Sequence, residues 1–444
     1  MKKWLLVWAA CMLLQLLPAQ QTSWKFDFGG SRSATGYLNI GTGTRYTDAQ
    51  GYGFTSGAGL TAYDRGGNAL SGDFITADQP FSFSVKLPDG NYDVKLIMGD
   101  SKGTSATTVR AECRRLMLEN IRTKKGMITT QQFTVHIKDS LIRDSSGKVL
   151  NRVKLKARES DYLHWDNLLS IEFSDSAAKV CAIEITPNKK ATTIFLAGNS
   201  TVVDQAREPW AAWGQIFPRY LMPGKVAVAN YAESGETMKA FNGERRLEKI
   251  WRLGKPGDYL FIEFTHNDQK PGGNHLDPFT TYKSTIKEWI NEARSRKMIP
   301  VLVTSMHRRR FDSTGHIENT LLEYPEAMRQ TAKEENILLI DLNAMSKTMY
   351  EAWGPEKSIR AFVHYPANTF PGQDKKLEDN THFTPYGAAS LARCIVYAIS
   401  KGSSPLKAFL RKDIQLYEPA KPQPFEQFYW PMSLFAPVVK PDGN

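Results

Sequence analysis

Beyond its first 20 residues this chain lacks any apolar run long enough to cross a membrane. Its longest apolar stretch, WLLVWAACMLLQLL, follows Lys2 and Lys3 and ends at Pro18-Ala19-Gln20. The stretch is shorter than the roughly 20 residues that a spanning helix needs. A basic start, an apolar centre and a small residue near the end are typical of a secretory signal. The sequence therefore predicts export, with cleavage between Ala19 and Gln21, and no membrane span.

Cysteine is scarce as well. One of the four cysteines, Cys11, lies in the predicted signal, which leaves Cys113, Cys181 and Cys394. An odd number in an exported protein of this size excludes a disulfide scaffold, and no pair has the spacing of a metal site. A single bridge between Cys113 and Cys181 and three buried thiols both remain open at this point.

Negative charge is in deficit: 57 Lys and Arg stand against 46 Asp and Glu, a formal net charge of +11. A basic surface favours acidic partners such as an acidic polysaccharide, an anionic lipid or nucleic acid. The densest basic cluster is Arg308-Arg309-Arg310, and no run has the spacing of a nucleic-acid site. Together with the predicted export, this excludes nucleic acid as a partner and favours an acidic polysaccharide.

Residues 21–189 have the texture of a β domain. Short runs of alternating apolar residues are separated by Gly, Asp, Asn and Ser, a pattern typical of an antiparallel β-sandwich. The runs are WKFDFGG, FSFSVKL, YDVKLIMG, TVRAEC, FTVHIKD, LSIEFSD and VCAIEITP. Tyr46 and Tyr52 lie in the Gly-rich loops of this domain, where they could either stack on sugars or pack against the protein.

From residue 190 to 404 the rhythm changes to short apolar strands that alternate with amphipathic helices, which predicts a parallel α/β sheet. The expected strands are TTIFLAG, VAVAN, DYLFIEF, IPVLVTS and ILLIDL, and one expected helix starts near Pro209. In such sheets the active site lies at the carboxyl ends of the strands. Residues 405–444 are rich in Pro and aromatic residues, and we expect an extended tail that bridges the two domains.

Polar residues follow three of these strands. Ser200 stands in Gly198-Asn199-Ser200-Thr201 at a strand-to-helix turn, where a nucleophile is exposed and backbone amides can bind an oxyanion. Gly235 lies in the loop after the second strand, and Asn267 lies in Thr265-His266-Asn267-Asp268 after the third. Taken singly, each motif is equally well an ordinary turn, and the G-x-S-x-G pattern is missing.

The last motif is Asp379-Asn380-Thr381-His382, just before the final helix. A histidine that acts as a base needs a carboxylate to hold its tautomer, and a D-x-x-H turn can bring the two side chains together. The same stretch is also a helix entrance, with Thr384 as N-cap and Pro385 at the first helical position. Both interpretations can hold at once.

The order of these four motifs resembles the SGNH or GDSL hydrolase superfamily, and "LAGNST", "THND" and "DNTHFTPYGA" resemble its rhamnogalacturonan acetylesterase branch. The resemblance covers about residues 191–401. It implies a three-layer α/β/α domain with a parallel five-stranded sheet. More loosely, residues 21–189 resemble the galactose-binding-like sandwiches attached to such esterases.

The resemblance implies a role for each site residue. Ser200 is the nucleophile, His382 the general base and Asp379 the group that orients it. The oxyanion donors are the backbone N–H groups of Ser200 and Gly235 and the side chain of Asn267. No metal or cofactor is implied.

Two residues depart from the family pattern, because Asn199 replaces an Asp and Thr265 replaces a Gly. The expected function is removal of O-acetyl groups from an acidic pectic polysaccharide such as rhamnogalacturonan. The alternatives are an acetylesterase for xylan, a non-catalytic carbohydrate-binding protein and a lipase-like esterase, although the chain has no long apolar lid segment.

Overall fold

The computed structural model describes residues 23–30, 33–370, 372–415 and 417–434. The predicted signal of residues 1–20 and the last ten residues of the tail lie outside this part. Among the described residues, no helix has both the length and the apolar character to span a bilayer.

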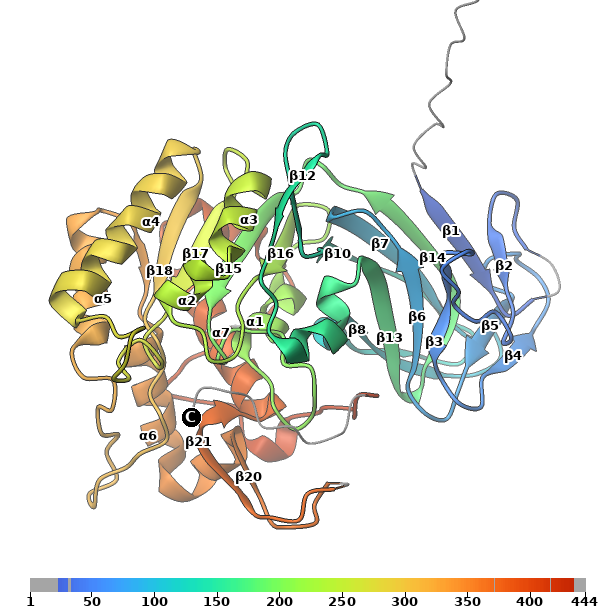
Figure 1. The fold of residues 1–444 in the computed structure, drawn as a ribbon. Helices are drawn as coiled ribbons and strands as arrows, with labels where there is room; N and C mark the ends of the chain where they lie inside the picture. Colours follow the sequence, from blue (N-terminus) through green and yellow to red (C-terminus); the bar gives the residue numbers. More distant parts are fainter. Residues whose placement is uncertain (1–22, 31–32, 371, 416, 435–444) are drawn as a thin grey trace, which may run out of the picture.

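Two facing β-sheets make up the first part of the chain, as predicted (Figure 1). One sheet has the order β10-β7-β14-β1-β2, with β5 paired to β14 and β4 to β5; the other has the order β3-β6-β13-β8-β9. All pairs are antiparallel except β1 and β2, which run parallel. The strands are β1 (Trp24–Phe28), β2 (Leu38–Ile40), β3 (Tyr52–Ser56), β4 (Thr61–Asp64), β5 (Asp73–Thr76), β6 (Phe81–Lys86), β7 (Gly90–Gly99), β8 (Ser105–Ala111), β9 (Arg115–Thr123), β10 (Ile128–Ile137), β13 (Leu168–Ala177) and β14 (Lys179–Pro187).

The core of the sandwich lies between the two sheets, because alternate residues of each strand point inward. Phe26 from one sheet and Phe83 from the other are both fully buried, with ring centroids 5.1 Å apart in an edge-to-face contact. Tyr52 packs partly buried against this core, 5.2 Å from the ring of Phe26. Tyr52 therefore serves packing, whereas Tyr46 is half-buried and donates to Asp48 (3.0 Å).

A connecting segment leaves the sandwich between β10 and β13 and lies against the second domain. It forms a hairpin of β11 (Leu141–Arg143) and β12 (Val149–Arg152), followed by two 3₁₀ turns, η1 (Ala157–Asp161) and η2 (Leu163–Trp165). Its buried residues Ile142, Val153 and Trp165 belong to a hydrophobic core of the second domain. The segment is thus part of that domain's packing, although its sequence belongs to the sandwich.

The second domain is built on a parallel five-stranded sheet of order β16-β15-β17-β18-β19, as predicted. The strands are β15 (Thr192–Gly198), β16 (Val226–Asn230), β17 (Tyr259–Glu263), β18 (Ile299–Val303) and β19 (Leu338–Ile340). Along β15, Ile194 and Leu196 face one core, while Phe195 and Ala197 face the other. Because both faces are covered, the strands are apolar throughout rather than alternating.

Helices cover the two faces of this sheet and complete three layers (Figure 1). The side chains of α1 (Trp213–Ile216), α6 (Leu342–Lys357) and α7 (Pro385–Lys401) pack in one core. Those of α2 (Met238–Gly243), α3 (Arg246–Leu253), α4 (Lys283–Ser295) and α5 (Tyr324–Glu334) pack in the other. A π-helical turn, η4 (Pro278–Tyr282), leads into α4, and β20 (Phe362–Tyr365) pairs with β21 (Leu377–Phe383) ahead of α7.

Two helix predictions need correction. The helix expected from Pro209 is wrong at its start, because Ala211 donates to the carbonyl of Phe383 (2.9 Å) and Ala212 is extended, so that helix begins only at Trp213. Helix α6 was not predicted, although Asp341 caps it by accepting from the N–H of Ala344 (3.2 Å). The expected helix entrance before α7 is confirmed, with Thr384 as N-cap and Pro385 in the first turn.

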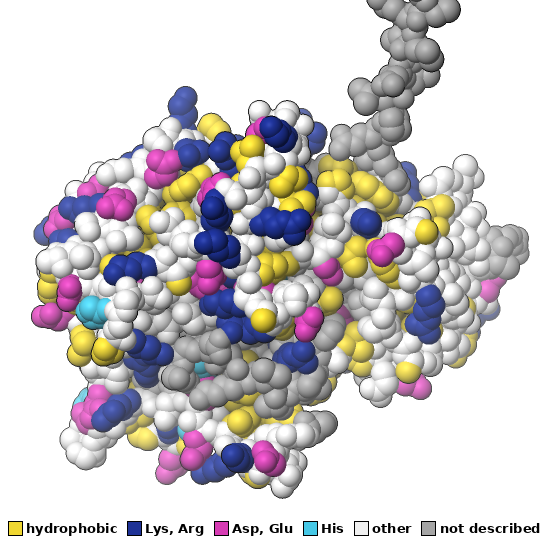
Figure 2. All heavy atoms as spheres, viewed as in Figure 1, with side chains coloured by type: hydrophobic (Ala, Val, Ile, Leu, Met, Phe, Trp, Pro, Cys, Tyr) yellow, Lys and Arg dark blue, Asp and Glu magenta, His cyan; other side chains and the backbone are white. Residues whose placement is uncertain are grey.

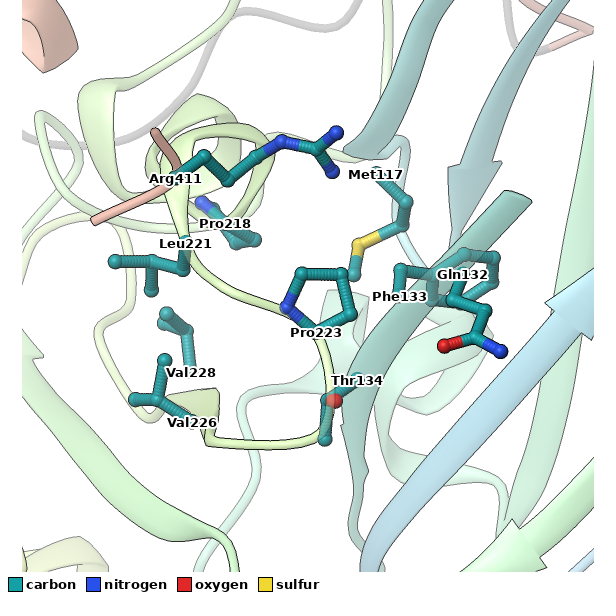
Figure 3. Close-up of a pocket in the computed structure, with 10 residues that line it drawn as sticks. All are labelled: Met117, Gln132, Phe133, Thr134, Pro218, Leu221, Pro223, Val226, Val228 and Arg411. Carbon is teal, nitrogen blue, oxygen red and sulfur yellow. The ribbon is translucent and has the colours of Figure 1, made fainter. Parts of the chain in front are cut away.

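The two domains share a buried, charged contact. Arg115 of β9 donates to Asp204 at 2.6 and 3.0 Å, and both side chains are almost completely buried. A small cavity of about 10 Å³ also lies between the domains, where strands β9 and β10 meet Arg411 and the chain from Pro218 to Val228 (Figure 3). It has room for about one water molecule and none for a substrate.

The described part of the tail bridges the domains, as predicted. Trp430 lies under the guanidinium of Arg110, 4.4 Å from its centre, and donates to Glu208 of the second domain (3.0 Å). Ser433 donates to Glu172 of β13 (2.5 Å).

Cys113, Cys181 and Cys394 are all free and buried, so Cys113 and Cys181 form no disulfide bridge.

Candidate active site

The carboxyl ends of β15, β16 and β17 lie side by side in the sheet, and the predicted site residues follow them. The carbonyl of Gly198, the last residue of β15, accepts from the N–H of Glu233 in the loop after β16 (3.3 Å). The side chain of Asn267, after β17, donates to the carbonyl of Glu236 in the same loop (3.0 Å). The three loops are therefore joined by hydrogen bonds at one edge of the sheet.

Ser200 stands on a tight turn at the end of β15. A Cβ atom at Gly198 would lie 2.5 Å from Val202 and 3.1 Å from the carbonyl of Glu263, so only glycine fits there. The carbonyl of Asn199 then accepts from the N–H groups of Val202 and Val203 (3.0 and 3.1 Å). This turn reverses the chain and leaves the Ser200 hydroxyl beside His382.

Ser200, His382 and Asp379 form one hydrogen-bonded chain. His382 Nε2 lies 2.8 Å from Ser200 Oγ, and His382 Nδ1 lies 2.7 Å from Asp379 Oδ2. All three are at least 94 % buried, which strengthens electrostatic contacts between them. The sequence separates Ser200 from His382 by 182 positions, and the tertiary fold brings them together.

A bulge in β21 places the acid and the histidine. The pairing of β20 with β21 jumps from Val363 opposite Asp379 to Phe362 opposite Phe383, so residues 380–382 loop out of the ladder. Asp379 Oδ1 accepts from the N–H groups of Thr381 (2.9 Å) and His382 (3.0 Å) and closes the turn. Burial raises the pKa of Asp379, but the contacts with His382 and these amides outweigh burial and lower the pKa below its usual range.

Gly235 and Asn267 line one cavity of about 410 Å³. Gly235 has a φ of +79°, a conformation that favours glycine. Asn267 has two amide hydrogens, of which one engages the carbonyl of Glu236, so the other is available to a ligand. The structure thus brings Gly235 and Asn267, two of the predicted donors, to a single cavity.

The basic cluster singled out in the sequence reaches this edge as well. Arg308 donates to the carbonyl of His266 (3.3 Å), and the N–H of Arg309 donates to the carbonyl of Asn380 in the bulge (2.8 Å). Arg308 therefore supports the loop of Thr265–Asp268, and Arg309 supports the bulge in β21.

One buried acid beneath the nucleophile turn was missed. Glu263, the last residue of β17, accepts from Trp213 (2.8 Å), Ser305 (2.8 Å) and the hydroxyl of Thr201 (3.2 Å). Burial raises the pKa of Glu263 to about 7. A glutamate inside the apolar run LFIEF is the signal that could have identified it, because a charge in a strand buried on both faces needs partners.

Asn199 keeps the hydrogen bonds that an aspartate would make here. Its Oδ1 accepts from the N–H (3.1 Å) and the hydroxyl (2.8 Å) of Thr201, while its Nδ2 has no partner among the described residues. The single proton of the Thr201 hydroxyl cannot serve both Asn199 and Glu263. A protonated Glu263 resolves this conflict, because it can donate to Thr201 in turn.

We therefore expect Asn199→Asp to change kcat by no more than about threefold, since both acceptor contacts survive. The variant places a second carboxylate beside Glu263 and raises the pKa of Glu263 further. A carboxyl group whose pKa is raised on folding stabilises the protein at low pH, and this stabilisation is lost as pH rises. We therefore expect the Tm of the variant to fall more steeply than that of wild type between about pH 5.5 and pH 8. Kinetics and thermal unfolding measure both effects. The matched control is Asn336→Asp at an exposed turn, and a fall in kcat beyond about tenfold would contradict this expectation.

Among the described residues, one group of side chains has the spacing of a metal site: Glu159, His164 and Glu233. Both carboxylates already have cationic partners, because Glu159 accepts from Arg246 (2.5 Å) and Glu233 from Arg158 (2.9 Å). A divalent cation would have to displace two arginines, so these residues do not fit a metal.

The matches to known proteins agree with this architecture. Residues 24–152 match the model of the "Beta-agarase/YXIM esterase-like, galactose-binding domain-like" family, and residues 196–389 match that of the "GDSL-like Lipase/Acylhydrolase family". The rhamnogalacturonan acetylesterase RhgT of Bacillus subtilis (strain 168) is 44% identical over 224 residues, which are 50% of this chain and 95% of that protein. The chain belongs to the GDSL-like lipase/acylhydrolase family. It is a carboxylic-ester hydrolase with an N-terminal galactose-binding-like domain.

Two further relatives come from the same organism. The probable rhamnogalacturonan acetylesterase YesY is 34% identical over 229 residues, which are 50% of this chain and 99% of that protein. The uncharacterized esterase YxiM is 24% identical over 417 residues, which are 90% of this chain and 98% of that protein. The match to YxiM extends over both domains, whereas the other two span about half of the chain.

Proposed function

We propose that this GDSL hydrolase is an exported carbohydrate esterase that removes O-acetyl groups from an acidic pectic polysaccharide of the rhamnogalacturonan type. The observation that carries the proposal is the hydrogen-bonded chain of Ser200, His382 and Asp379 at the edge of the sheet. The 44% identity to a rhamnogalacturonan acetylesterase supports the substrate class. The signal predicted for residues 1–20 supports export.

In the first half of the reaction, Ser200 Oγ attacks the carbonyl carbon of the acetyl group while His382 Nε2 takes the hydroxyl proton. Asp379 holds the proton on Nδ1 and stabilises the positive ring. The negative charge that develops on the carbonyl oxygen is met by the N–H groups of Ser200 and Gly235 and by the amide of Asn267.

The tetrahedral intermediate then collapses and breaks the bond to the sugar oxygen, which receives the proton from His382. In the second half, His382 removes a proton from water, the resulting hydroxide attacks the acetyl-serine, and acetate leaves as Ser200 recovers its proton. All proton transfers are carried by this chain's own residues.

The cavity beside Gly235 and Asn267 supports an acidic substrate. Lys156 and Lys270 line it together with the loop of residues 271–274. Lys and Arg side chains gather near the middle of the face drawn in Figure 2. The ammonium group of Lys270 at this cavity is suited to the carboxylates of galacturonate residues that flank an acetylated sugar.

Replacing Lys270 with methionine should raise KM for acetylated rhamnogalacturonan about fivefold, because a cation facing the uronate is lost. Hydrolysis of p-nitrophenyl acetate, which carries no carboxylate, should stay within about twofold of wild type. Steady-state kinetics on both substrates measure the difference, with Lys401→Met at the far end of α7 as the control. Equal effects on both substrates would argue against a uronate contact at Lys270.

The proposed function is tested by measuring acetate released from acetylated rhamnogalacturonan beside acetylated xylan, with wild type and Ser200→Ala. Release from the pectic polymer that depends on Ser200 supports the proposal. Ser200-dependent release from xylan alone would keep the mechanism and change the substrate. No release from either polymer would contradict the proposal.

A further inference from the structure

The peptide unit that joins Ser234 to Gly235 has two functional ends. Its N–H, on Gly235, is one of the proposed oxyanion donors, and its carbonyl belongs to Ser234. In a trans peptide these two groups point in opposite directions, and the one cis bond among the described residues is Glu208–Pro209. The direction of the Ser234 carbonyl therefore fixes the direction of the Gly235 N–H.

Two cations of the connecting segment hold this carbonyl. Lys156 Nζ and Arg158 Nη2 each donate to the oxygen of Ser234 at 2.7 Å. A carbonyl oxygen has two lone pairs, so these two donors occupy its acceptor capacity. Hydrogen bonds from charged donors are stronger than neutral ones. They also draw electron density toward the oxygen, which makes the N–H of the same peptide a better donor.

The segment that carries the two cations is itself anchored. Between them and η2 stands Glu159, which accepts from Arg246 of α3 (2.5 Å), from Trp165 Nε1 (3.0 Å) and from the N–H of Lys156 (2.8 Å). The side chains of Glu159 and Arg246 are fully buried. Lys156 and Arg158 are thus held in place before any substrate arrives.

Each of the two cations also has a carboxyl partner. Arg158 donates to Glu233 at 2.9 and 3.1 Å, and Lys156 is paired with Glu236. Both carboxyl groups flank the same short loop, where burial raises the pKa of Glu233 to about 7 and that of Glu236 to about 8.

The Ser234–Gly235 peptide needs such a restraint. Turning it over changes ψ of Ser234 and φ of Gly235, and glycine accepts both signs of φ at little cost. Gly235, at φ +79°, therefore does not by itself prevent the inverted orientation. An inverted peptide would present a carbonyl oxygen where the oxyanion forms, and the reaction would lose a donor and meet a repulsive charge.

We propose that Lys156 and Arg158 are positioning residues through which the N-terminal half of the chain locks the Ser234–Gly235 peptide, with its N–H turned to the oxyanion. This inference rests on the proposed function. It gives the connecting segment a role in the chemical step rather than in sugar binding. Separate expression of the α/β domain would remove both cations and leave this donor unrestrained.

The test uses the full chain with Lys156→Met, Arg158→Met and the double variant. We expect kcat for p-nitrophenyl acetate to fall about tenfold in each single variant and about 100-fold in the double, with KM within about twofold, because the peptide acts on the transition state. The matched control is Arg65→Met in the sandwich. Arg65 is 28% exposed and contacts Asp100 through two nitrogens, much as Arg158, 26% exposed, contacts Glu233.

A second measurement separates positioning from general damage. A boronic acid that forms a tetrahedral adduct with Ser200 should lose affinity in parallel with kcat, since its oxygen needs the same donor. Arg158→Lys, which keeps a cation able to reach the carbonyl, should recover part of the loss even if a methionine variant folds poorly. Thermal unfolding identifies such variants.

The outcomes distinguish failure of the positioning role from failure of the proposed esterase function. If hydrolysis depends on Ser200 and the single and double variants match Arg65→Met in kcat and boronate affinity, the positioning role is overturned and the function stands. If wild-type hydrolysis does not depend on Ser200, the proposed function itself fails. Parallel losses of kcat and boronate affinity at constant KM establish the positioning role.

Discussion

Ser200→Ala is expected to lower kcat for acetate release by about 10⁴- to 10⁶-fold while the protein remains folded. The variant removes the atom that attacks the acetyl carbon, and no neighbour can replace it. The nearest hydroxyl in the turn, on Thr201, donates to Asn199 (2.8 Å) and is held at Glu263. Acetate release measured on the polymer, and p-nitrophenolate release measured by absorbance, report the loss.

Folding should change little, because the turn is held by contacts that alanine keeps. The carbonyl of residue 200 still accepts from Gln205 Nε2 (2.7 Å), and Gly198 and Asn199 still close the turn. We expect Tm to shift by no more than about 3 °C. Ser295→Ala, an exposed serine on α4, controls for the loss of a hydroxyl. A Ser200→Ala enzyme with more than about a tenth of wild-type kcat would remove Ser200 from the mechanism.

The second large effect is expected for Asp379→Asn, which should lower kcat about 10³- to 10⁴-fold with KM nearly unchanged. An asparagine can still accept the N–H groups of Thr381 and His382 through its oxygen. Its amide nitrogen would then face His382 Nδ1, which must become an acceptor. The ring proton moves to Nε2, and the histidine can no longer take the proton of Ser200.

The same substitution has a predictable effect on stability. Because the pKa of Asp379 is lowered on folding, the carboxylate stabilises the protein above the unperturbed pKa of 3.8, and this stability is lost as pH falls. The Tm difference between wild type and Asp379→Asn should therefore shrink on acidification toward about pH 3. Thermal unfolding over a pH series measures it, with the exposed Asp374→Asn as control. An unchanged kcat in Asp379→Asn would contradict the assignment of Asp379 as the acid that orients His382.

The sequence predicted every residue of the proposed triad through the order of four short motifs and their resemblance to a known family, since no single motif was distinctive. Ser200 follows a glycine at the end of an apolar strand, and His382 follows Asp379 by three positions ahead of a capped helix. Such patterns depend on neighbours a few residues apart, which determine turns and caps. The alternation of apolar strands with amphipathic helices likewise predicted the parallel sheet, because both faces of that sheet are buried.

Local patterns predicted the wrong backbone conformation where a segment distant in the sequence determines it. Residues 209–212 have helical composition, but Ala211 is paired with Phe383, 172 positions later, so the chain stays extended there. Asp379 and His382 were expected in a plain turn, and the structure builds that turn as a bulge within the β20–β21 ladder.

Only the tertiary structure could reveal the support of the Gly235 peptide. Lys156 and Arg158 lie 78 and 76 positions before Ser234, in a stretch with no motif of its own. A lysine and an arginine in such a stretch can be solvated or can donate to a carbonyl, and the packing of the two domains determines which. The sequence by itself therefore determined the site residues that lie in short local motifs. The tertiary structure decided the orientation of the Ser234–Gly235 peptide, because that orientation depends on how the two domains pack.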